Sequence, residues 1–264
     1  MRPETPYPQS LVVHALSTRD EVLILMPRES FDRQLRGLEH EVLILGSMVA
    51  SAVERAIVAL REPNGPLAEL VIAGDTPIDL LAKRIEERAL LLIAMQQPMA
   101  SDLRMIAGVI AIAAELERIG DYAEGIATLA LRGLDEPPLK PLIDLPLMAS
   151  MAVDMLRRCL EAFINCDAEA ARDIWDEDDA IDLLQGRIYR DLLACMADQP
   201  GAIERGTRLL WISHNVERVA DRVTNICERI IFVCEGSSSA FAAPPAYASA
   251  LESPSRLRRV DSML

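Results

Sequence analysis

The strongest constraint on how this chain can fold is a repeat within it. Residues 115–126 read ELERIGDYAEGI and residues 215–226 read NVERVADRVTNI, so a Glu-Arg-x-x-Asp word occurs twice. A second word, Asp-x-x-x-Asp followed by Leu-Leu, begins at Asp75 and again at Asp178. Repetition at a regular period is typical of one structural unit that occurs more than once. The chain is therefore expected to form two similar sub-domains of roughly 100 residues each.

Within each unit the apolar spacing is that of helices. From Phe31 to Leu60, apolar residues recur every three or four positions, the period of one continuous helix face. Hydrophobic residues make up 51% of the chain but aromatic residues only 4%, a composition that favours helices over strands. The predicted fold class is all-α: two tandem antiparallel three-helix bundles, each with a short extra helix.

Prolines, glycines and capping residues set the expected boundaries. We expect an N-terminal extension at 1–29 with a short element at Val22–Met26, a first repeat at 30–133, a linker at 134–146, a second repeat at 147–236 and a disordered tail at 237–264. In the first repeat, a short segment at 67–73 precedes a helix capped by Thr76, with Pro77 in its first turn, and Ser101 caps the next helix. In the second repeat, Asp167 caps a short helix and Gly236 closes the last one.

The net charge of −14 argues against several classes of partner. A nucleic-acid backbone or an anionic membrane surface would repel so acidic a protein. No unbroken apolar run reaches the roughly 18 residues that span a bilayer, and the N-terminus lacks the apolar core of a signal peptide. We therefore expect a cytoplasmic protein that neither binds nucleic acid directly nor inserts into a membrane.

The five cysteines all fall in the second half of the chain, at positions 159, 166, 195, 227 and 234. Their number is odd and no Cys-x-x-Cys pair occurs. This pattern favours reduced, packed thiols over a disulfide framework or a zinc site.

The acids of the repeated words lie on the helix faces that are expected to face the bundles. At 100° per residue, Glu117 and Asp121 continue the stripe that begins with Leu103 and Ile106. Carboxylates that point at partner helices cost several kcal/mol each through lost hydration, and they also repel one another. A multivalent cation removes both penalties. If the two words of a unit lie side by side, four carboxylates converge: Asp75, Asp79, Glu117 and Asp121 in the first unit, and Asp178, Asp182, Glu217 and Asp221 in the second.

Ligands that are all oxygen select hard cations such as magnesium, manganese or ferric iron, and zinc becomes an option if His214 joins them. The Glu-x-x-His word of di-iron oxidase bundles is absent from the sequence, which disfavours redox catalysis on that template.

Ordinary alternatives exist for each acid. Asp79 could pair with Lys83, Asp121 with Arg118, and residues 176–179 could be a plain acidic turn. A metal-dependent enzyme would need an open coordination position and a general base, and the sequence offers no nucleophile–base constellation. A metal-free helical adaptor, whose acids form ion pairs, would have a stability indifferent to chelators. Four words at matched positions favour metal binding over these alternatives.

Several residues around these words resemble the PhoU family of accessory regulators of phosphate uptake. In the first unit they are Gln97-Pro98, Asp102-Leu103-Arg104 and Glu117-Arg118-Ile119-Gly120-Asp121. In the second they are Glu217-Arg218-Val219-Ala220-Asp221, Asn225-Ile226, Glu228 and Gly236. The family's motif often continues Asp-His-Ala-x-Asn, whereas this chain has Tyr122 and Arg222 after the two aspartates. The likeness covers about residues 30–236.

The resemblance implies tandem three-helix bundles, multinuclear metal clusters at the acidic words, frequent homodimers and no catalysed reaction. It also implies two partners, the ATPase subunit of the phosphate ABC transporter and the sensor histidine kinase of the phosphate regulon, both held inactive when phosphate is plentiful. The expected function is therefore that of a metal-binding negative regulator of phosphate uptake and phosphate-regulon signalling, which acts by docking and is not an enzyme. The expected cofactors are iron, manganese, magnesium or zinc ions in clusters.

Overall fold

A computed structural model of the chain describes residues 28–236 except 138 and 140. Its elements are α1 (Arg28–Arg61), α2 (Gly65–Gln96), α3 (Ala100–Arg132), α4 (Asp144–Asn165), α5 (Ala168–Asp176), α6 (Asp178–Asp198), the 3-10 turn η1 (Pro200–Ala202) and α7 (Ile203–Glu235). Within the described residues no strand occurs, so the all-α prediction is confirmed. The element expected at Val22–Met26 and the tail at 237–264 lie outside the described residues.

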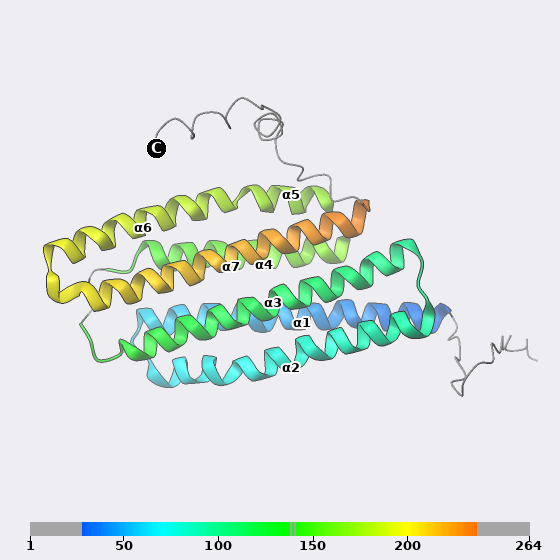
Figure 1. Ribbon diagram of the computed structural model, residues 1–264, viewed down its shortest axis with the longest axis horizontal. Helices are drawn as coiled ribbons and strands as arrows, with labels where there is room; N and C mark the ends of the chain where they lie inside the picture. The colour runs from blue at the N-terminus through cyan, green and yellow to red at the C-terminus, as the bar shows by residue number, and fades with distance from the viewer. Residues whose placement is uncertain (1–27, 138, 140, 237–264) are drawn as a thin grey trace, which may run out of the picture.

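The helices form two packed units of similar plan (Figure 1). α1, α2 and α3 make the first unit, and α4, α7 and the pair α5–α6 make the second. α3 and α7 lie side by side at the centre, α2 and α5–α6 form the two opposite edges, and α1 and α4 pack behind the central pair (Figure 1). The repeated acidic words on α3 and α7 are therefore at the middle of the molecule.

The two units share one core. Buried side chains from all seven α-helices form a single connected cluster. The units approach most closely where a glycine on one helix faces a bulky residue on another. Gly46 of α1 lies against Leu160 of α4, and Gly108 of α3 lies against Val233 of α7. These contacts bury apolar surface between the units, which stabilises their mutual position.

The two helix pairs that join the units, α3 with α7 and α1 with α4, both run antiparallel. Along α3 and α7, Gly108 faces Val233 and Gly125 faces Asn215, so the numbering rises on one helix as it falls on the other. Along α1 and α4, Gly46 faces Leu160, and Glu54 pairs with Arg157. In each of these pairs, a helix of the first unit packs against the equivalent helix of the second unit. The two units are therefore related by an approximate twofold rotation.

α1 is long and apolar enough, by length and composition alone, to cross a membrane. An 18-residue window within it has a mean hydropathy of 1.8, and half of that window is buried inside the protein. The buried residues include Val42, Leu45 and Val49, each fully inaccessible to solvent in the shared core. α1 is therefore placed as a core helix of this bundle.

The break predicted near Thr76 in the first unit is wrong, because α2 runs without interruption from Gly65 to Gln96 with Pro77 inside it. Asn64, not Thr76, caps this helix, by accepting a hydrogen bond from the backbone N–H of Leu67 at 3.1 Å. Ala73 and Pro77 are both exposed, so the carbonyl group that the proline leaves without its helical donor lies where water can reach it. Between Arg28 and Arg132, the first unit has no short extra helix.

The second unit matches its prediction more closely. Asp167 caps α5 by accepting a hydrogen bond from the backbone N–H of Ala170, and α5 ends at Asp176, with Glu177 alone between it and α6. Gly236 closes α7 with φ 75°, as predicted. Two predicted boundaries are wrong: Ser101 lies inside α3, whose N-cap is Met99, and α4 begins at Asp144, inside the predicted linker.

The prediction that all cysteines are reduced is also wrong. Cys166, at the end of α4, forms a disulfide with Cys234, in the last turn of α7. Cys159, Cys195 and Cys227 are free thiols. The pairing was not visible in the local sequence because it joins residues 68 positions apart.

Candidate metal centres

The first acidic cluster lies where α2 and α3 meet. Asp75 and Asp79 are one turn apart on α2, and Asp121 approaches them from α3. Each of these three residues offers a carboxylate oxygen within 4.8 Å of the oxygens of the other two. Asp79 and Asp121 are exposed while Asp75 is half-buried, so the cluster sits at the rim of the helix contact and is open to solvent. A cation could enter without any rearrangement of the core.

The charges of this cluster act on one another. Burial raises the pKa of Asp75 from 3.8 to about 6, helped by the nearby negative charges of Asp79, Asp121, Glu124 and Glu117. Burial and the same acidic neighbours also raise the pKa of Glu117 and of Asp121, which the Arg118 guanidinium partly opposes. The four predicted ligands of the first unit therefore share one electrostatic environment.

One oxygen in the first cluster lacks a donor. Oδ1 of Asp75 is buried and accepts no hydrogen bond within the described structure. The backbone of Gly120 makes room for it, since a Cβ atom at that position would lie 3.3 Å from this oxygen and 3.0 Å from Ile78. A buried oxygen without a donor is costly unless a further group satisfies it, and a cation would do so.

The second cluster repeats this arrangement between α6 and α7. Asp178 and Asp182 are one turn apart on α6, and Glu217 and Asp221 are one turn apart on α7. Burial raises the pKa of Asp178 to about 6, with the charges of Asp182, Asp221, Glu217 and Asp179 adding to the shift. Oδ1 of Asp178 is also buried without a hydrogen-bond donor, like its counterpart in Asp75. The oxygens of Asp75, Asp79 and Asp121 thus converge in the first unit, whereas in the second unit the acids are linked by the charges that raise the pKa of Asp178.

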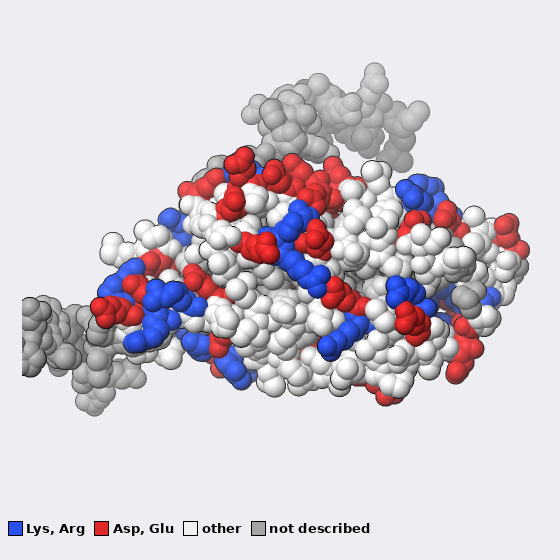
Figure 2. All heavy atoms as spheres, turned by 180° about the vertical axis from the view of Figure 1, so that it is seen from behind, with Lys and Arg blue, Asp and Glu red and all other residues white. Residues whose placement is uncertain are grey.

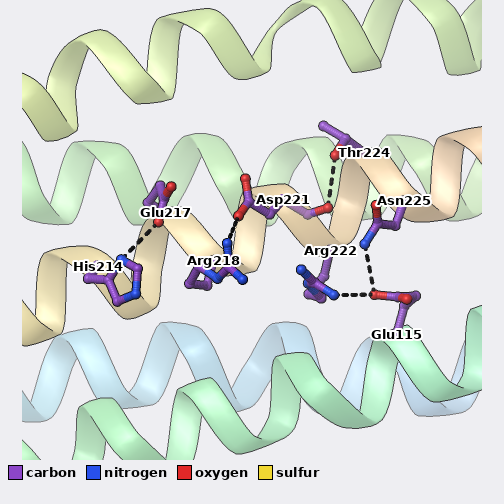
Figure 3. A network of polar contacts seen from close by, with 8 residues as sticks. All are labelled: Glu115, His214, Glu217, Arg218, Asp221, Arg222, Thr224 and Asn225. Carbon is purple, nitrogen blue, oxygen red and sulfur yellow. Dashed lines mark hydrogen bonds and ion pairs between the residues drawn. The ribbon is translucent and has the colours of Figure 1, made fainter. Parts of the chain in front are cut away.

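The second cluster differs from the first because basic side chains already touch it (Figure 3). The Arg218 guanidinium donates to Oδ2 of Asp221 at 2.6 Å. Nδ1 of His214 lies 3.1 Å from Oε2 of Glu217, although the two groups are not aligned for a hydrogen bond. His214 therefore lies beside the cluster, as the zinc alternative with mixed nitrogen and oxygen ligands requires.

Two acids outside the predicted ligand sets belong to the same environments. Glu124 contributes to the raised pKa of Asp75, and Asp179 contributes to the raised pKa of both Asp178 and Asp182. Glu124 follows Glu117 by seven positions on the same helix stripe, a spacing that could have identified it. Its counterpart in the second unit is Thr224, whose hydroxyl donates to the backbone carbonyl of Asp221 at 2.8 Å. The first cluster is accordingly the more acidic of the two along its α3 or α7 stripe.

A polar network joins the two motif helices between the clusters (Figure 3). Oε2 of Glu115 on α3 accepts hydrogen bonds from Arg222 and from Asn225 on α7, both at 3.2 Å. Tyr122, next to Asp121 on α3, contacts Arg218 on α7 and raises the pKa of its guanidinium. Tyr122 and Arg222, which directly follow the aspartates of the two repeated words, therefore serve the contact between the units.

The surface near the clusters combines acids with exposed leucines. Leu80 follows Asp79 and is 60% exposed, and its repeat counterpart Leu183 follows Asp182 and is 74% exposed. In Figure 2 acidic side chains gather along the upper edge, where Figure 1 draws α5 and α6. Residues 168–198 contain nine acids and three arginines, so this edge suits a partner with basic and apolar groups.

Chemically, these sites can hold cations, but among the described residues they present no pair of nucleophile and base. A separate pocket of about 620 Å³ lies where the linker meets the ends of α1, α3 and α7, and none of the eight predicted ligands lines it. Leucine is the most frequent residue in its walls, which also include Arg205 and Arg208. The guanidinium of Arg208 is held by both carboxylate oxygens of Glu136 at 3.0 Å.

Comparison with known proteins gives a consistent result. The PhoU domain family matches residues 42–130 and 145–230, one match in each unit. The phosphate-specific transport system accessory protein PhoU homolog of Aquifex aeolicus is 37% identical over 204 residues, which are 77% of this chain and 92% of that protein. The homolog from Caulobacter vibrioides is 36% identical over 209 residues, 79% of this chain and 91% of that protein.

Two solved structures share the fold. The crystal structure of PhoU from Pseudomonas aeruginosa superposes with a TM-score of 0.76 at 29% identity, covering 78% of this chain and all of the other. The phosphate transport system regulatory protein PhoU from Streptococcus pneumoniae gives a TM-score of 0.74 at 32% identity, covering 78% of this chain and 98% of the other.

Proposed function

Because this chain belongs to the PhoU family, whose members regulate phosphate transport, we propose that it is a cytoplasmic, cation-binding negative regulator of phosphate uptake and phosphate-regulon signalling. It would act by docking to the ATPase subunit of the phosphate ABC transporter and to the phosphate sensor histidine kinase. The observations that support cation binding are the three carboxylates of the first unit whose oxygens lie within 4.8 Å of one another, and the buried carboxylate oxygen without a donor in each cluster, on Asp75 and on Asp178.

The residues present fit a hard cation. Asp75, Asp79, Glu117 and Asp121 would hold it in the first unit, and Asp178, Asp182, Glu217 and Asp221 in the second. All eight offer oxygen, which suits magnesium, manganese or ferric iron, and His214 adds the nitrogen that zinc prefers. A bound cation would neutralise the repulsion within each cluster and fasten α2 to α3 and α6 to α7.

We propose docking rather than catalysis because the clusters adjoin exposed apolar residues and not a nucleophile–base pair. Leu80 and Leu183 occupy equivalent positions on the outer helices α2 and α6, each beside its cluster. Exposed apolar residues rimmed by charge are typical of protein interaction sites. A partner with an apolar patch flanked by basic side chains would complement both sites, and the cations would set the positions of the two leucines.

A homodimer is proposed on family likeness alone. Light scattering after gel filtration would measure the molar mass in solution. A mass equal to one chain at all concentrations tested would contradict the homodimer.

The cation proposal is tested by metal analysis of the purified protein. The variant Asp75→Asn with Asp121→Asn should lose the metal of the first unit, and Asp178→Asn with Asp221→Asn should lose that of the second. The matched control is Glu86→Gln with Glu87→Gln, which removes two exposed carboxylates from α2 outside the cluster. Equal metal content in all four proteins would remove the cation proposal.

The docking proposal is tested by capture of the purified transporter ATPase and the purified sensor kinase on immobilised protein. Leu80→Glu with Leu183→Glu should abolish capture, whereas Leu70→Glu, at a residue of α2 that is 54% exposed, should leave it unchanged. Capture that survives the double change would place the docking surface elsewhere. The same comparison in cells grown with ample phosphate should show derepressed uptake only for the double variant.

A further inference from the structure

The second unit contains two facing pairs of cysteines, whereas the first unit contains no cysteine. α4 together with its C-cap residue carries two cysteines seven residues apart, Cys159 and Cys166, and α7 carries Cys227 and Cys234 opposite them. At the outer pair, Cys166 and Cys234 form a disulfide with their Cα atoms 5.6 Å apart, within the usual range for such a bridge. At the inner pair, Sγ of Cys159 and Sγ of Cys227 are 3.5 Å apart as free thiols.

The two pairs have opposite access to solvent. Cys166 is exposed and Cys234 is partly exposed, so a reagent in solution can reach the outer bond. Cys159 and Cys227 are fully buried. Burial, together with the contact with Cys227, raises the pKa of the Cys159 thiol well above its usual value, and the burial of both inner thiols keeps dissolved reagents away from them. Only the outer pair is placed for exchange with dissolved thiols.

The outer bond ties three elements together. Cys166 ends α4, and the next residue, Asp167, caps α5. Cys234 lies in the last turn of α7, beside Glu235, whose carboxylate accepts from Arg172 of α5 at 2.6 Å. The ion pair is half-exposed and therefore screened by water, so the covalent bond is the main link at this end of the second unit.

We propose that Cys166–Cys234 is a reversible thiol–disulfide site that fastens α5 and the last turn of α7 to α4, and that low-molecular-weight thiols such as glutathione open it. The biological setting rests on the proposed cytoplasmic location, where a solvent-accessible disulfide is exposed to a thiol pool and persistent structural disulfides are rare. The chemistry of the site does not depend on the cation clusters.

The exchange balances with glutathione as the only co-reactant. A glutathione thiolate attacks Sγ of the exposed Cys166, the bond to Cys234 breaks, and Cys234 leaves as a thiolate that takes a proton from water. A second glutathione thiolate then attacks the mixed disulfide at its glutathione sulfur and releases Cys166. The protein gains two electrons and two protons, and two glutathione molecules become one molecule of oxidised glutathione.

The first test equilibrates the full-length protein in glutathione buffers of graded reduced-to-oxidised ratio, traps thiols with an alkylating reagent and counts them by mass. Cys195 is a partly exposed free thiol, and its mixed disulfide with glutathione in oxidising buffers is told apart from closure of the outer bond because the mass then includes the added glutathione. We expect two further alkylated cysteines, Cys166 and Cys234, in reducing buffers and their loss in oxidising ones. If the bond stays closed in the most reducing glutathione buffer, it is a static cross-link. If Cys166 and Cys234 stay reduced in every buffer, they do not form a disulfide. Either result overturns the proposal.

The second test measures hydrogen exchange of the oxidised and the reduced protein. Reduction should accelerate exchange several-fold at residues 166–176 and 230–236 and leave residues 100–132 of α3 unchanged. Cys166→Ser should behave like the reduced protein in both buffers, and Cys159→Ser with Cys227→Ser should keep the redox dependence. Exchange that is the same in both states would overturn the fastening role. Metal content measured on the same samples reports separately on the cation clusters, so failure of one proposal is distinguishable from failure of the other.

Discussion

The Arg218 guanidinium lies 2.6 Å from the Asp221 carboxylate, so one predicted ligand of the second cluster is already paired with a positive charge from the next turn of its own helix. The equivalent residue of the first unit, Arg118, is exposed. A cation that binds the second cluster must compete with Arg218 for Asp221. The two clusters are thus unequal although their acids occupy equivalent positions.

Replacing Arg218 should strengthen cation binding at the second cluster. With the first cluster silenced by Asp75→Asn and Asp121→Asn, Arg218→Gln should raise the affinity for Mn²⁺ about fivefold, because a partly exposed ion pair within one helix is worth about 1 kcal/mol. Isothermal titration calorimetry would measure the affinity. The control is Arg229→Gln, an exposed residue of the same helix, which should change little. A weaker affinity in Arg218→Gln would show that the guanidinium orders the site instead of competing for it.

The metal-free protein should lose stability as the pH rises through the range set by Asp75 and Asp178. Both carboxyls have a pKa raised from 3.8 to about 6 in the folded state, so folding favours their protonated form. Their contribution is full below about pH 4 and is lost between about pH 4 and 6. Because both groups are partly exposed, the loss is roughly 1 kcal/mol for each after solvent screening.

Asp75→Asn isolates this effect. In chelator at pH 7 the variant should be about 1 kcal/mol more stable than the unchanged protein, and at pH 4 the two should agree. Urea unfolding at each pH measures the difference, and Mn²⁺ should reverse its sign at pH 7. Glu86→Gln, outside the cluster, should show no such pH dependence. An Asp75→Asn protein that is less stable at pH 7 without metal would contradict the repulsion described for this cluster.

Glu115 should contribute more to the free energy of unfolding than an exposed ion pair at the same interface between the units. It accepts hydrogen bonds from Arg222, whose side chain is only 13% exposed, and from Asn225. Glu115→Ala leaves the buried guanidinium unpaired and should cost about 2 kcal/mol of unfolding free energy. Glu54→Ala removes the exposed pair with Arg157 and should cost less than about 1 kcal/mol. Equal losses in chemical denaturation would argue against the burial difference as the cause.

Two glycines should respond in opposite ways to alanine. Gly74 lies inside α2, and a Cβ atom added there would meet no other atom within 4 Å, so Gly74→Ala should stabilise by about 0.5–1 kcal/mol through helix propensity. A methyl group on Gly46 would overlap Leu160, so Gly46→Ala should destabilise by about 1–3 kcal/mol. Thermal unfolding of both variants provides the measurement. A destabilised Gly74→Ala would indicate that α2 is broken near this residue after all.

Periodicity alone predicted most of the fold. The apolar spacing from Phe31 to Leu60 gave α1, and the repeated words placed Glu117 and Glu217 on equivalent helices. A helical period of 100° per residue assigns both the buried face and the residues that continue it, which is why the approach of Asp121 to Asp75 and Asp79 was predictable. The pairing of α1 with α4 and of α3 with α7 was not, since it depends on close approaches such as that of Gly46 to Leu160.

The continuity of α2 shows where local signals mislead. Thr76 and Pro77 form a good start for a helix, yet Val71 and Ile78 on either side are both buried in the same core. Burying each contributes about 1.5–3 kcal/mol, which together offsets the roughly 3 kcal/mol cost of a proline inside a helix. The disulfide was missed for a related reason, because its partners come together only through the packing of α4 on α7. The seven-residue spacing shared by the two pairs of cysteines was the signal available in the sequence.

The antiparallel meeting of α3 with α7 and of α1 with α4 has a further consequence. Each unit offers the other the same face that it receives, which is the isologous contact of a twofold homodimer enclosed in one polypeptide. Because the two units belong to one polypeptide, they are always present in equal number and do not dissociate on dilution. Their side chains are also free to diverge separately, as Tyr122 and Arg222 have done at matching positions. Joining the halves thus turns a symmetric pair into one with two distinguishable ends.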